Sequence, residues 1–238
     1  MKNETVIKQG PVIAIDGPAG TGKSSVTKRL ADALGYTHID TGAMYRSIAY
    51  LGLEKWGGIE ELTEERSVEV ANTTSLAFRR EPSKNPANRI YANGRDLTDK
   101  IRTPEVSMAA SRVSAFKGVR QALLSLQRRL GCQGKTILEG RDIGTVIFPD
   151  ADVKFFLTAS VEERAKRRLA ELEASGVDVP TFSELVKQIE ARDFADTNRE
   201  IAPLKVAVDA IVLDTSAHTL DEVVAQLSAK AKERIKRT

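Results

Sequence analysis

One octapeptide near the start of the chain restricts the fold more than any other feature. It reads Gly17-Pro18-Ala19-Gly20-Thr21-Gly22-Lys23-Ser24. It satisfies the pattern G-x-x-x-x-G-K-[ST], in which a glycine-rich loop leaves a buried strand and opens a helix. The apolar run at residues 11–16 precedes it, and apolar residues at helical spacing follow it as far as Gly35. The sequence therefore predicts a strand, a phosphate-binding loop and a helix in that order.

The chemistry of this loop explains its composition. Glycines let the backbone curl so that successive amides face a phosphate, and the positive end of the following helix favours the anion. In such a loop Lys23 bridges the β- and γ-phosphates, and the Ser24 hydroxyl binds Mg²⁺. A glycine-rich turn without a ligand is the alternative, and the strand-to-helix context argues against it. We therefore expect ATP or GTP to bind here.

Apolar runs and helical patterns alternate through much of the remaining chain. The apolar runs are residues 136–140, 153–157 and 210–214, and the helical patterns are residues 161–174, 182–196 and 220–236. This alternation is typical of an α/β fold whose mostly parallel sheet is covered by helices on both faces. Residues 37–40 are too few to assign alone.

Residues 75–102 interrupt the alternation. They read as short strands joined by Pro- and Asn-rich turns, and Asn93-Gly94 is a hairpin signal. We therefore predict a small antiparallel insertion. Residues 1–10 read as a loose tail, and the closing AKERIKRT as the basic end of a solvated helix.

Composition excludes several classes of protein. In 238 residues, 36 Lys and Arg against 33 Asp and Glu leave a net charge of +3, which does not demand a nucleic-acid partner. No apolar run reaches the roughly 20 residues of a membrane helix, and the start lacks the apolar stretch of a signal peptide, so we expect a cytoplasmic protein. Cys132, with only His38 and His218 in the chain, argues against disulfide, zinc and thiol chemistry.

A phosphate-binding loop alone does not separate kinases from GTPases, motors and transporters. The Asn-Lys-x-Asp stretch of GTPases and the Leu-Ser-Gly-Gly stretch of transporter ATPases do not occur in the sequence. Arginine beside short polar residues stands out instead, at expected strand ends where ligands lie in open α/β sheets. The segments are Asp40-Thr41-Gly42-Ala43-Met44-Tyr45-Arg46, residues 139–145 and residues 192–199.

Each segment predicts a place for its arginine. Arg46 is expected about one turn into a helix that follows a strand and a turn, and Arg141 in a glycine-bounded loop after a strand. The spacing of the third segment predicts one helix face that carries Arg192, Asp196 and Arg199. Arginines that converge on a pocket suit a phosphorylated acceptor, although each alone fits a surface ion pair equally well.

A further basic set follows the strand at residues 153–157. It consists of Arg164, Arg167 and Arg168 at spacings i, i+3 and i+4. It fits either a mobile lid over the triphosphate or a solvated helix face paired with glutamates 162, 163 and 171. Spacing alone favours the solvated face.

Taken in order, IDGPAGTGKSS, DTGAMYR, EGRDIGT and RDFADTNR resemble the bacterial cytidylate kinase family, whose members phosphorylate CMP and dCMP with ATP. The resemblance implies a P-loop three-layer fold with a parallel five-stranded sheet, a small antiparallel monophosphate-binding insertion and an arginine-bearing helical lid. Residues 1–238 would form a single nucleoside-monophosphate kinase domain. Its core would be residues 11–40, 132–160 and 200–238, its monophosphate-binding region about 41–131 and its lid about 161–181.

The resemblance also implies roles for individual residues. ATP would bind residues 17–25, Ser25 included, and the catalytic residues would be Lys23, Arg141, Arg164 and Arg168. The CMP site would consist of Thr41, Arg46, Ser111, Arg120, Arg141, Asp142, Arg192, Asp196 and Arg199. Among these, Ser111 or Asp142 would accept from the exocyclic amine of cytosine, which uracil lacks, and Arg120 would donate to the ring. The resemblance also favours the lid over the solvated face for Arg164, Arg167 and Arg168.

Two of these motifs depart from the family pattern. Glu139 stands where the family usually has Gly or Asp, and Phe194-Ala195 replaces a more charged pair. Neither departure involves one of the arginines.

The expected reaction is in-line transfer of the γ-phosphoryl group from MgATP to the α-phosphate of CMP or dCMP, with Mg²⁺ as cofactor. The resemblance implies a monomer that needs neither nucleic acid nor a membrane. One alternative is a kinase for UMP, AMP or another phosphorylated metabolite. Another is a nucleotide-dependent switch or nucleic-acid-remodelling protein, which the near-balanced charge disfavours.

Overall fold

A computed structural model of the chain describes residues 8–81, 83–84, 86, 88–175 and 179–236. These form two compact units. We call residues 39–130 the inserted unit, and residues 8–38 with 131–236 the sheet unit. The chain passes between the units after His38 and after Leu130.

The elements follow one another in this order. The strands are β1 (Val12–Asp16), β2 (Thr37–Asp40), β3 (Leu76–Arg80), β4 (Asn88–Ala92), β5 (Arg95–Asp96), β6 (Thr136–Gly140), β7 (Val153–Thr158) and β8 (Ile211–Asp214). The helices are α1 (Lys23–Leu34), α2 (Thr41–Trp56), α3 (Glu64–Thr73), α4 (Pro104–Ala115), α5 (Lys117–Gly131), α6 (Val161–Ser175), α7 (Phe182–Asn198) and α8 (Leu220–Ile235). Short helical segments are η1 (Ile59–Glu61), η2 (Lys100–Arg102) and the π-helical η3 (Ile143–Ile147).

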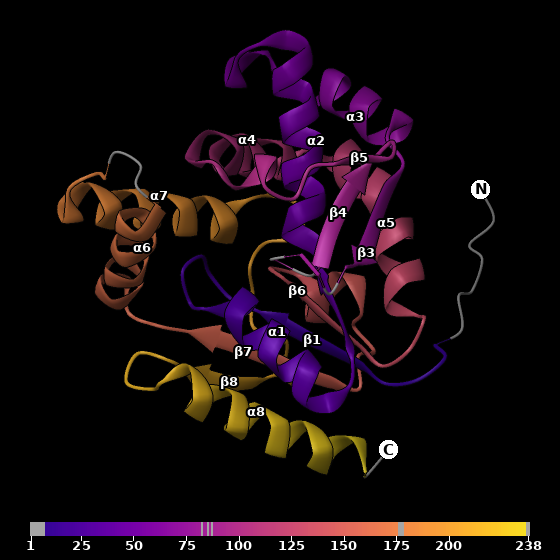
Figure 1. Ribbon diagram of the computed structural model, residues 1–238, viewed down its shortest axis with the longest axis vertical. Coiled ribbons are helices and arrows are strands. Elements are labelled where there is room, and N and C mark those ends of the chain that lie inside the picture. The colour runs from indigo at the N-terminus through magenta and orange to yellow at the C-terminus, as the bar shows by residue number, and fades with distance from the viewer. Residues whose placement is uncertain (1–7, 82, 85, 87, 176–178, 237–238) are drawn as a thin grey trace. The chain divides into compact units, whose positions relative to one another are not determined.

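The five-stranded sheet has the strand order β2-β6-β1-β7-β8 (Figure 1). β1 runs parallel to β6 and β7, and β7 runs parallel to β8. All of β1 is buried, as expected of a central strand that is covered on both faces. The predicted α/β fold with a parallel sheet is confirmed, and residues 37–40 form its strand β2.

An apolar core fixes the start of the phosphate-binding loop. Ile13 and Ile15 of β1 pack in one buried cluster with Leu30 of α1, Phe155 of β7 and Leu227 of α8. Figure 1 shows α1 and α8 side by side along this part of the sheet. The predicted helix end at Gly35 is confirmed: this residue caps α1 with a left-handed φ of 67°.

Helices α6 and α7 pack against each other through Ala165, Leu172, Leu185 and Ile189. Their bounds agree with the predicted helices within one or two residues. Residues 176–178, inside the predicted lid range, lie outside the described residues.

The inserted unit contains a three-stranded antiparallel sheet in the order β3-β4-β5. The predicted antiparallel insertion is therefore confirmed. Its hairpin turn is Asn93-Gly94, with φ of 49° and 79°, the left-handed pair that such a turn requires. Residues 82, 85 and 87 of the predicted turn-rich stretch lie outside the described residues.

The prediction of a loose tail at residues 1–10 is wrong for residues 8–10, the part of it that the structure describes. Lys8 donates to the carbonyl of Asp150 at 2.7 Å, and the amide of Gln9 donates to the carbonyl of Cys132 at 2.9 Å. These contacts tie the chain down before β1. Residues 1–7 and 237–238 lie outside the described residues.

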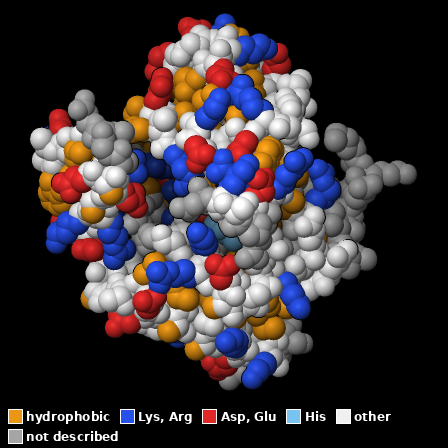
Figure 2. Space-filling model, in the orientation of Figure 1, with side chains coloured by type: hydrophobic (Ala, Val, Ile, Leu, Met, Phe, Trp, Pro, Cys, Tyr) orange, Lys and Arg blue, Asp and Glu red, His pale blue; other side chains and the backbone are white. Residues whose placement is uncertain are grey.

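The surface of each unit carries charges of both signs, interspersed on the face drawn in Figure 2. This distribution agrees with the small net charge of the sequence. In the described part of the chain, no helix has both the length and the apolar character that crossing a bilayer would require.

Candidate active site

The phosphate-binding loop joins β1 to α1 through backbone conformations that side chains disfavour. Gly17, Gly20 and Gly22 have φ of 146°, 77° and 81°. A Cβ on Gly17 would overlap the carbonyl oxygen of Leu157, so the loop passes β7 at a distance that only glycine allows. The predicted order of strand, loop and helix is confirmed.

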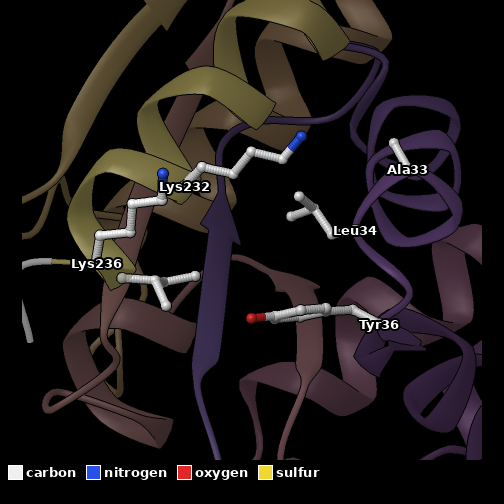
Figure 3. Close-up of a pocket in the computed structure, with 6 residues that line it drawn as sticks. Ala33, Leu34, Tyr36, Lys232 and Lys236 are labelled. Atoms are coloured by element: carbon white, nitrogen blue, oxygen red, sulfur yellow. The ribbon is translucent and has the colours of Figure 1, made fainter.

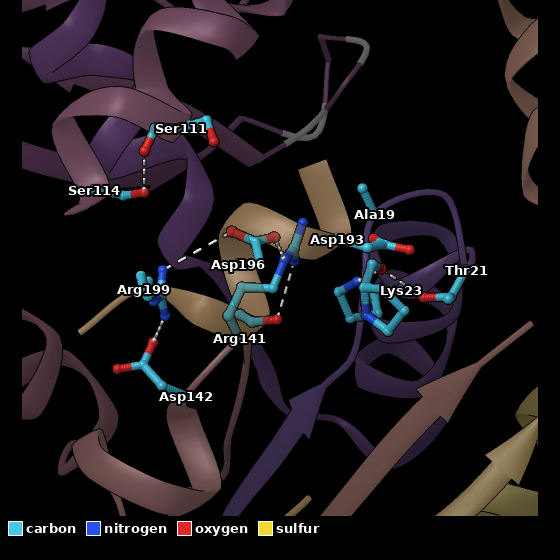
Figure 4. Close-up of polar contacts among 12 residues, drawn as sticks. Ala19, Thr21, Lys23, Ser111, Ser114, Arg141, Asp142, Asp193, Asp196 and Arg199 are labelled. Carbon is cyan, nitrogen blue, oxygen red and sulfur yellow. Dashed lines mark hydrogen bonds and ion pairs between the residues drawn. The ribbon is translucent and has the colours of Figure 1, made fainter. Parts of the chain in front are cut away.

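Lys23 folds back onto this loop in the described structure. Its ammonium donates to the carbonyl oxygen of Pro18 and lies 3.3 Å from the Thr21 hydroxyl (Figure 4), and the residue is only 7% exposed. Burial lowers the pKa of Lys23 well below its ordinary value, and the positive charge of Arg141 lowers it further, against the opposing effect of Glu139. A bound phosphate would supply the negative charge that the ammonium lacks here.

Ser24 contacts a carboxylate that sequence analysis did not assign to the site. The Ser24 hydroxyl donates to Glu139 Oε2 at 2.9 Å, and the other oxygen of Glu139 lies 2.7 Å from Nε2 of His38. Glu139 is 4% exposed and is the penultimate residue of β6, the strand beside β1. A hydroxyl and a carboxylate are oxygen ligands of the kind that Mg²⁺ prefers. The missed signal was an acidic residue at the end of a buried strand.

Arg141 and Asp142 follow β6, where a glycine-bounded loop was expected. The loop is confirmed for Arg141 and Asp142, which form a bend after the strand, but the expectation is wrong from Ile143, where the π-helical segment η3 begins. Arg141 Nε donates to Asp196 Oδ2 at 2.8 Å, and its Nη1 donates to the carbonyl of Gly140 at 3.1 Å. Figure 4 shows the side chains of Arg141 and Asp196 directed toward each other.

Arg192, Asp196 and Arg199 come from α7 and its end. The prediction that all three share one helix face is wrong for Arg199, because α7 ends at Asn198 and Arg199 has extended backbone angles, φ −61° and ψ 141°. Its guanidinium donates to the carbonyl of Ala202 and has Nη2 3.5 Å from Asp142 Oδ1 (Figure 4).

Asp196 is the acidic centre of this group. Burial would raise the pKa of Asp196, but the charge and hydrogen bond of Arg141 outweigh it, together with the charges of Arg192 and Arg199. The net effect is a pKa below the ordinary value. The carboxylate therefore stays ionised and orients arginines at the end of β6 and at the end of α7.

The three arginines of α6 lie in different surroundings. Arg164 is 4% exposed, pairs with Asp193 at 2.6 Å and donates to the carbonyl of Ala19 in the phosphate-binding loop at 3.2 Å. Arg167 donates to the hydroxyl and the carbonyl of Thr215 and pairs with Glu163.

Arg168 pairs with Glu171 at 3.1 Å near the surface. The solvated-face interpretation thus describes Arg168, whereas Arg164 lies against the phosphate-binding loop. The pairing of Asp193 and Thr215 with arginines of α6 could not be predicted from the sequence, because the partners come from different elements. The role of a lid stays a prediction.

In the inserted unit, Asp40 organises the start of α2. One of its oxygens accepts from the amide of Ala43 at 3.0 Å, and the other accepts from Arg46 Nη2 at 2.7 Å. α2 begins at Thr41 directly after β2, so the turn expected between strand and helix is absent. A Cβ on Gly42 would lie 3.0 Å from Arg46 Nη1, so the glycine leaves room for the guanidinium.

Ser111 and Arg120 meet through a third residue of the inserted unit. The carbonyl of Ser111 accepts from the hydroxyl of Ser114 at 2.9 Å, and the carbonyl of Ser114 accepts from Arg120 Nη1 at 3.1 Å. The guanidinium of Arg120 also lies 5.6 Å from the ring centre of Tyr45. Thr41, the first residue of α2, is buried in the same unit.

A cavity of about 290 Å³ lies elsewhere in the sheet unit, where α1 meets α8 (Figure 3). Its lining residues are Ala33, Leu34, Tyr36, Lys232, Ile235 and Lys236. None of them is a predicted site residue.

Comparison with known proteins adds to this geometry. Residues 13–233 match the family described as cytidylate kinase. The chain is 47% identical over 230 residues to a cytidylate kinase of Citrifermentans bemidjiense, covering 97% of this chain and 96% of that protein. It is also 47% identical over 231 residues to one of Geobacter sulfurreducens, covering 97% of each. A solved gluconokinase from Sinorhizobium meliloti 1021 has 16% identity and a TM-score of 0.46, covering 97% of this chain and 96% of that one.

Proposed function

Because this chain belongs to the cytidylate kinase family, we propose that it transfers the γ-phosphoryl group of ATP to CMP or dCMP and releases ADP with CDP or dCDP. One observation carries the proposal. β1 and β6 are parallel neighbours with Asp16 opposite Gly140, so the phosphate-binding loop and the Arg141-Asp142 pair leave the same edge of the sheet. A donor loop and an anion-binding arginine therefore start side by side.

The donor would be held by residues 17–25. Curled glycine backbone offers amides to the phosphates, and Lys23 would leave the Pro18 carbonyl to bind the β- and γ-phosphates. Arg164, already against Ala19, and Arg168 would add positive charge at the transferring group.

The acceptor would be bound by the residues that the resemblance assigns to it. Arg141 and Arg46 would bind its phosphate, Arg192 and Asp196 its sugar, and Arg199 a further phosphate or sugar oxygen. In support, Asp196 and Asp40 hold Arg141 and Arg46 by hydrogen bonds, which orients each guanidinium before the acceptor arrives.

The base would be read by Ser111, Arg120 and Asp142, with Thr41 near the acceptor. An acceptor oxygen on Asp142 or Ser111 fits the exocyclic amine of cytosine, and uracil would leave that oxygen unpaired. The buried guanidinium of Arg120 is fixed by the Ser114 carbonyl, which suits a donor that must discriminate.

Mg²⁺ would be held by the Ser24 hydroxyl with Glu139 behind it, a donor pair already within hydrogen-bond distance. The ion would neutralise charge on the ATP phosphates. No strong general base is required, because the acceptor oxygen is already anionic. The protein's own contribution would be alignment of the two phosphates and positive charge around them.

We further propose that residues 1–238 act as a single nucleoside-monophosphate kinase domain, with the core, monophosphate-binding region and lid given by the resemblance. We propose that it works as a monomer without nucleic acid or membrane. We propose that it acts in the cytoplasm, where both ATP and free nucleoside monophosphates are present.

The test is ADP release from MgATP with CMP, dCMP, UMP, AMP or GMP, and without an acceptor. Turnover with CMP and dCMP well above the others supports the reaction and the base reading. Preference for another monophosphate would contradict the cytosine assignment. ADP release that no acceptor increases would contradict the kinase proposal and favour a nucleotide-dependent switch.

A further inference from the structure

Asp16 makes two contacts that connect the phosphate-binding strand to the acceptor side of the site. It is the last residue of β1 and is 4% exposed. Its Oδ1 accepts from the amide of Ile143 at 2.9 Å, and its Oδ2 accepts from the amide of Gly144 at 2.8 Å. Because these amides open η3, they have no partner within that helical segment, and a carboxylate satisfies both.

Gly144 allows the close approach. A Cβ on this residue would lie 3.4 Å from Asp16 Oδ2 and 3.1 Å from Cδ of Lys154. Lys154 cannot readily yield, since its ammonium is bound to Asp209 at 2.8 Å. The start of η3 is therefore enclosed between the Asp16 carboxylate and the Lys154 side chain.

The two residues before Ile143 are Arg141 and Asp142. Their side chains bind Asp196 at 2.8 Å and lie 3.5 Å from Arg199, respectively. Asp16 forms its hydrogen bonds with the backbone of the next two residues. It therefore fixes the segment that carries both side chains.

We propose that Asp16 is a positioning residue: by holding the amides of Ile143 and Gly144, it sets where Arg141 and Asp142 meet the acceptor nucleotide. This inference rests on the proposed kinase function. It deepens that function, because it makes acceptor binding depend on a residue that opens the donor loop.

The raised pKa of Asp16 agrees with this proposal and gives it a pH dependence. Burial raises the pKa of Asp16 to about 6, against the two amide hydrogen bonds that lower it. The charged groups facing it are Asp142 before η3, which raises the pKa, Lys23 of α1, which lowers it, and Lys154 of β7. A protonated carboxyl offers an O–H to one of the two amides, so one hydrogen bond is lost. Acceptor binding should therefore weaken as the pH falls through about 6.

The first experiment is Asp16→Asn in the full chain. The new NH₂ group meets one of the two amides, so we expect the KM for CMP to rise roughly tenfold while the KM for ATP changes less than about twofold. The acid-side fall in kcat/KM for CMP near pH 6 should also become shallower, keeping only the part that comes from protonation of the CMP phosphate, whose second pKa is about 6. Unchanged KM values, or an equal loss for ATP and CMP, would overturn the proposal.

A matched control lies at the opposite end of the same strand. Asp152 Oδ2 accepts from the amide of Val12 at 2.8 Å, so Asp152→Asn alters the same kind of carboxylate-to-amide contact far along β1 from η3. We expect both KM values and the pH profile to stay as in the wild type. An equal rise in the KM for CMP in this control would show that any disturbance of β1 weakens CMP binding, and that Asp16 has no specific positioning role.

Amide hydrogen exchange tests the contact without substrate. The amides of Ile143 and Gly144 should exchange slowly in the wild type and faster in Asp16→Asn, and equal rates would overturn the proposal. Gly144→Ala, which pushes against the same contact, should raise the KM for CMP if Asp16→Asn does not fold. Absence of CMP turnover in the wild type would contradict the kinase function instead, and the exchange rates would still decide the role of Asp16.

Discussion

The ammonium of Lys23 is buried against its own loop, bonded to the carbonyl of Pro18 and close to the Thr21 hydroxyl. Because burial lowers the pKa of Lys23, the fold disfavours the charged form of this side chain, and the ammonium contributes little to the stability of the protein. We therefore expect Lys23→Ala to keep the melting temperature while ADP release with CMP falls roughly 10³-fold. Near-normal turnover would contradict the mechanism. A large fall in melting temperature would mean that the lysine has a structural role.

Glu139 is the second residue whose surroundings predict a specific phenotype. The carboxylate accepts from Ser24, and an amide in its place keeps the shape but loses the charge that favours a cation. We expect Glu139→Gln to raise the Mg²⁺ concentration for half-maximal activity about tenfold or more. Glu184→Gln, at the cap of α7, should leave it unchanged. An unaltered Mg²⁺ requirement in Glu139→Gln would remove the residue from the metal site.

Among the elements, α7 and α8 begin with the same device. Thr181 with Glu184, and Thr219 with Glu222, each form a capping box in which side chain and backbone satisfy each other. We expect Thr181→Ala and Thr219→Ala each to lower the free energy of unfolding by about 1 kcal/mol in urea titrations. Neither should change the KM for CMP, because Asp196 lies near the far end of α7. A changed KM in Thr181→Ala alone would show that fraying reaches the site.

The elements also show what a single sequence can predict. Strands β6 and β7 and helices α6 and α7 were predicted within one or two residues, because long apolar patterns with fixed period determine them. The segment η3 was not, since the partner of its first amides is Asp16, 127 and 128 residues away. The chain also leaves α7 before Arg199, and the spacing of four and three residues between Arg192, Asp196 and Arg199 does not reveal where the helix ends.

The candidate site divides along the same line. Lys23, Ser24 and the glycines were predicted from the sequence motif alone, because all of them lie within eight consecutive residues, 17–24. The acceptor residues came from resemblance to a family. The pairs Ser24–Glu139 and Arg164–Asp193 could not be predicted, because each joins residues of different elements. Their roles in catalysis stay predictions.

At the scale of the whole molecule, buried and paired carboxyl groups change the free energy of unfolding in opposite directions as the pH falls. Folding raises the pKa of Asp16 from 3.8 to about 6, so the folded protein holds this proton more tightly than the unfolded chain. The free energy of unfolding should therefore rise as the pH falls from about 6 toward 4, by up to about 3 kcal/mol from this group.

Asp96, whose pKa is about 2, and Asp196 act in the opposite sense. The stability that they contribute is present above their unfolded pKa and is lost as the pH falls through their lowered values. Urea unfolding from pH 2 to 8 covers both effects, because the Asp16 effect falls between about pH 6 and 4 and the Asp96 effect between about pH 4 and 2. Asp16→Asn should remove the rise below pH 6, while Asp152→Asn should keep it. An identical profile in Asp16→Asn and the wild type would contradict this account.

The position of β1 in the middle of the sheet has a consequence for the newly made chain. Val12 lies opposite Thr136, and Ile13 lies opposite Val153, so neither neighbour of β1 is complete until residues 136–158 have been synthesised. At about 5–20 residues per second, this apolar strand leaves the ribosome on the order of ten seconds before its partners. During that time both of its edges are open to other chains. β1 is therefore made well before both of its neighbours in the sheet, and its backbone edges are paired only once β6 and β7 have followed.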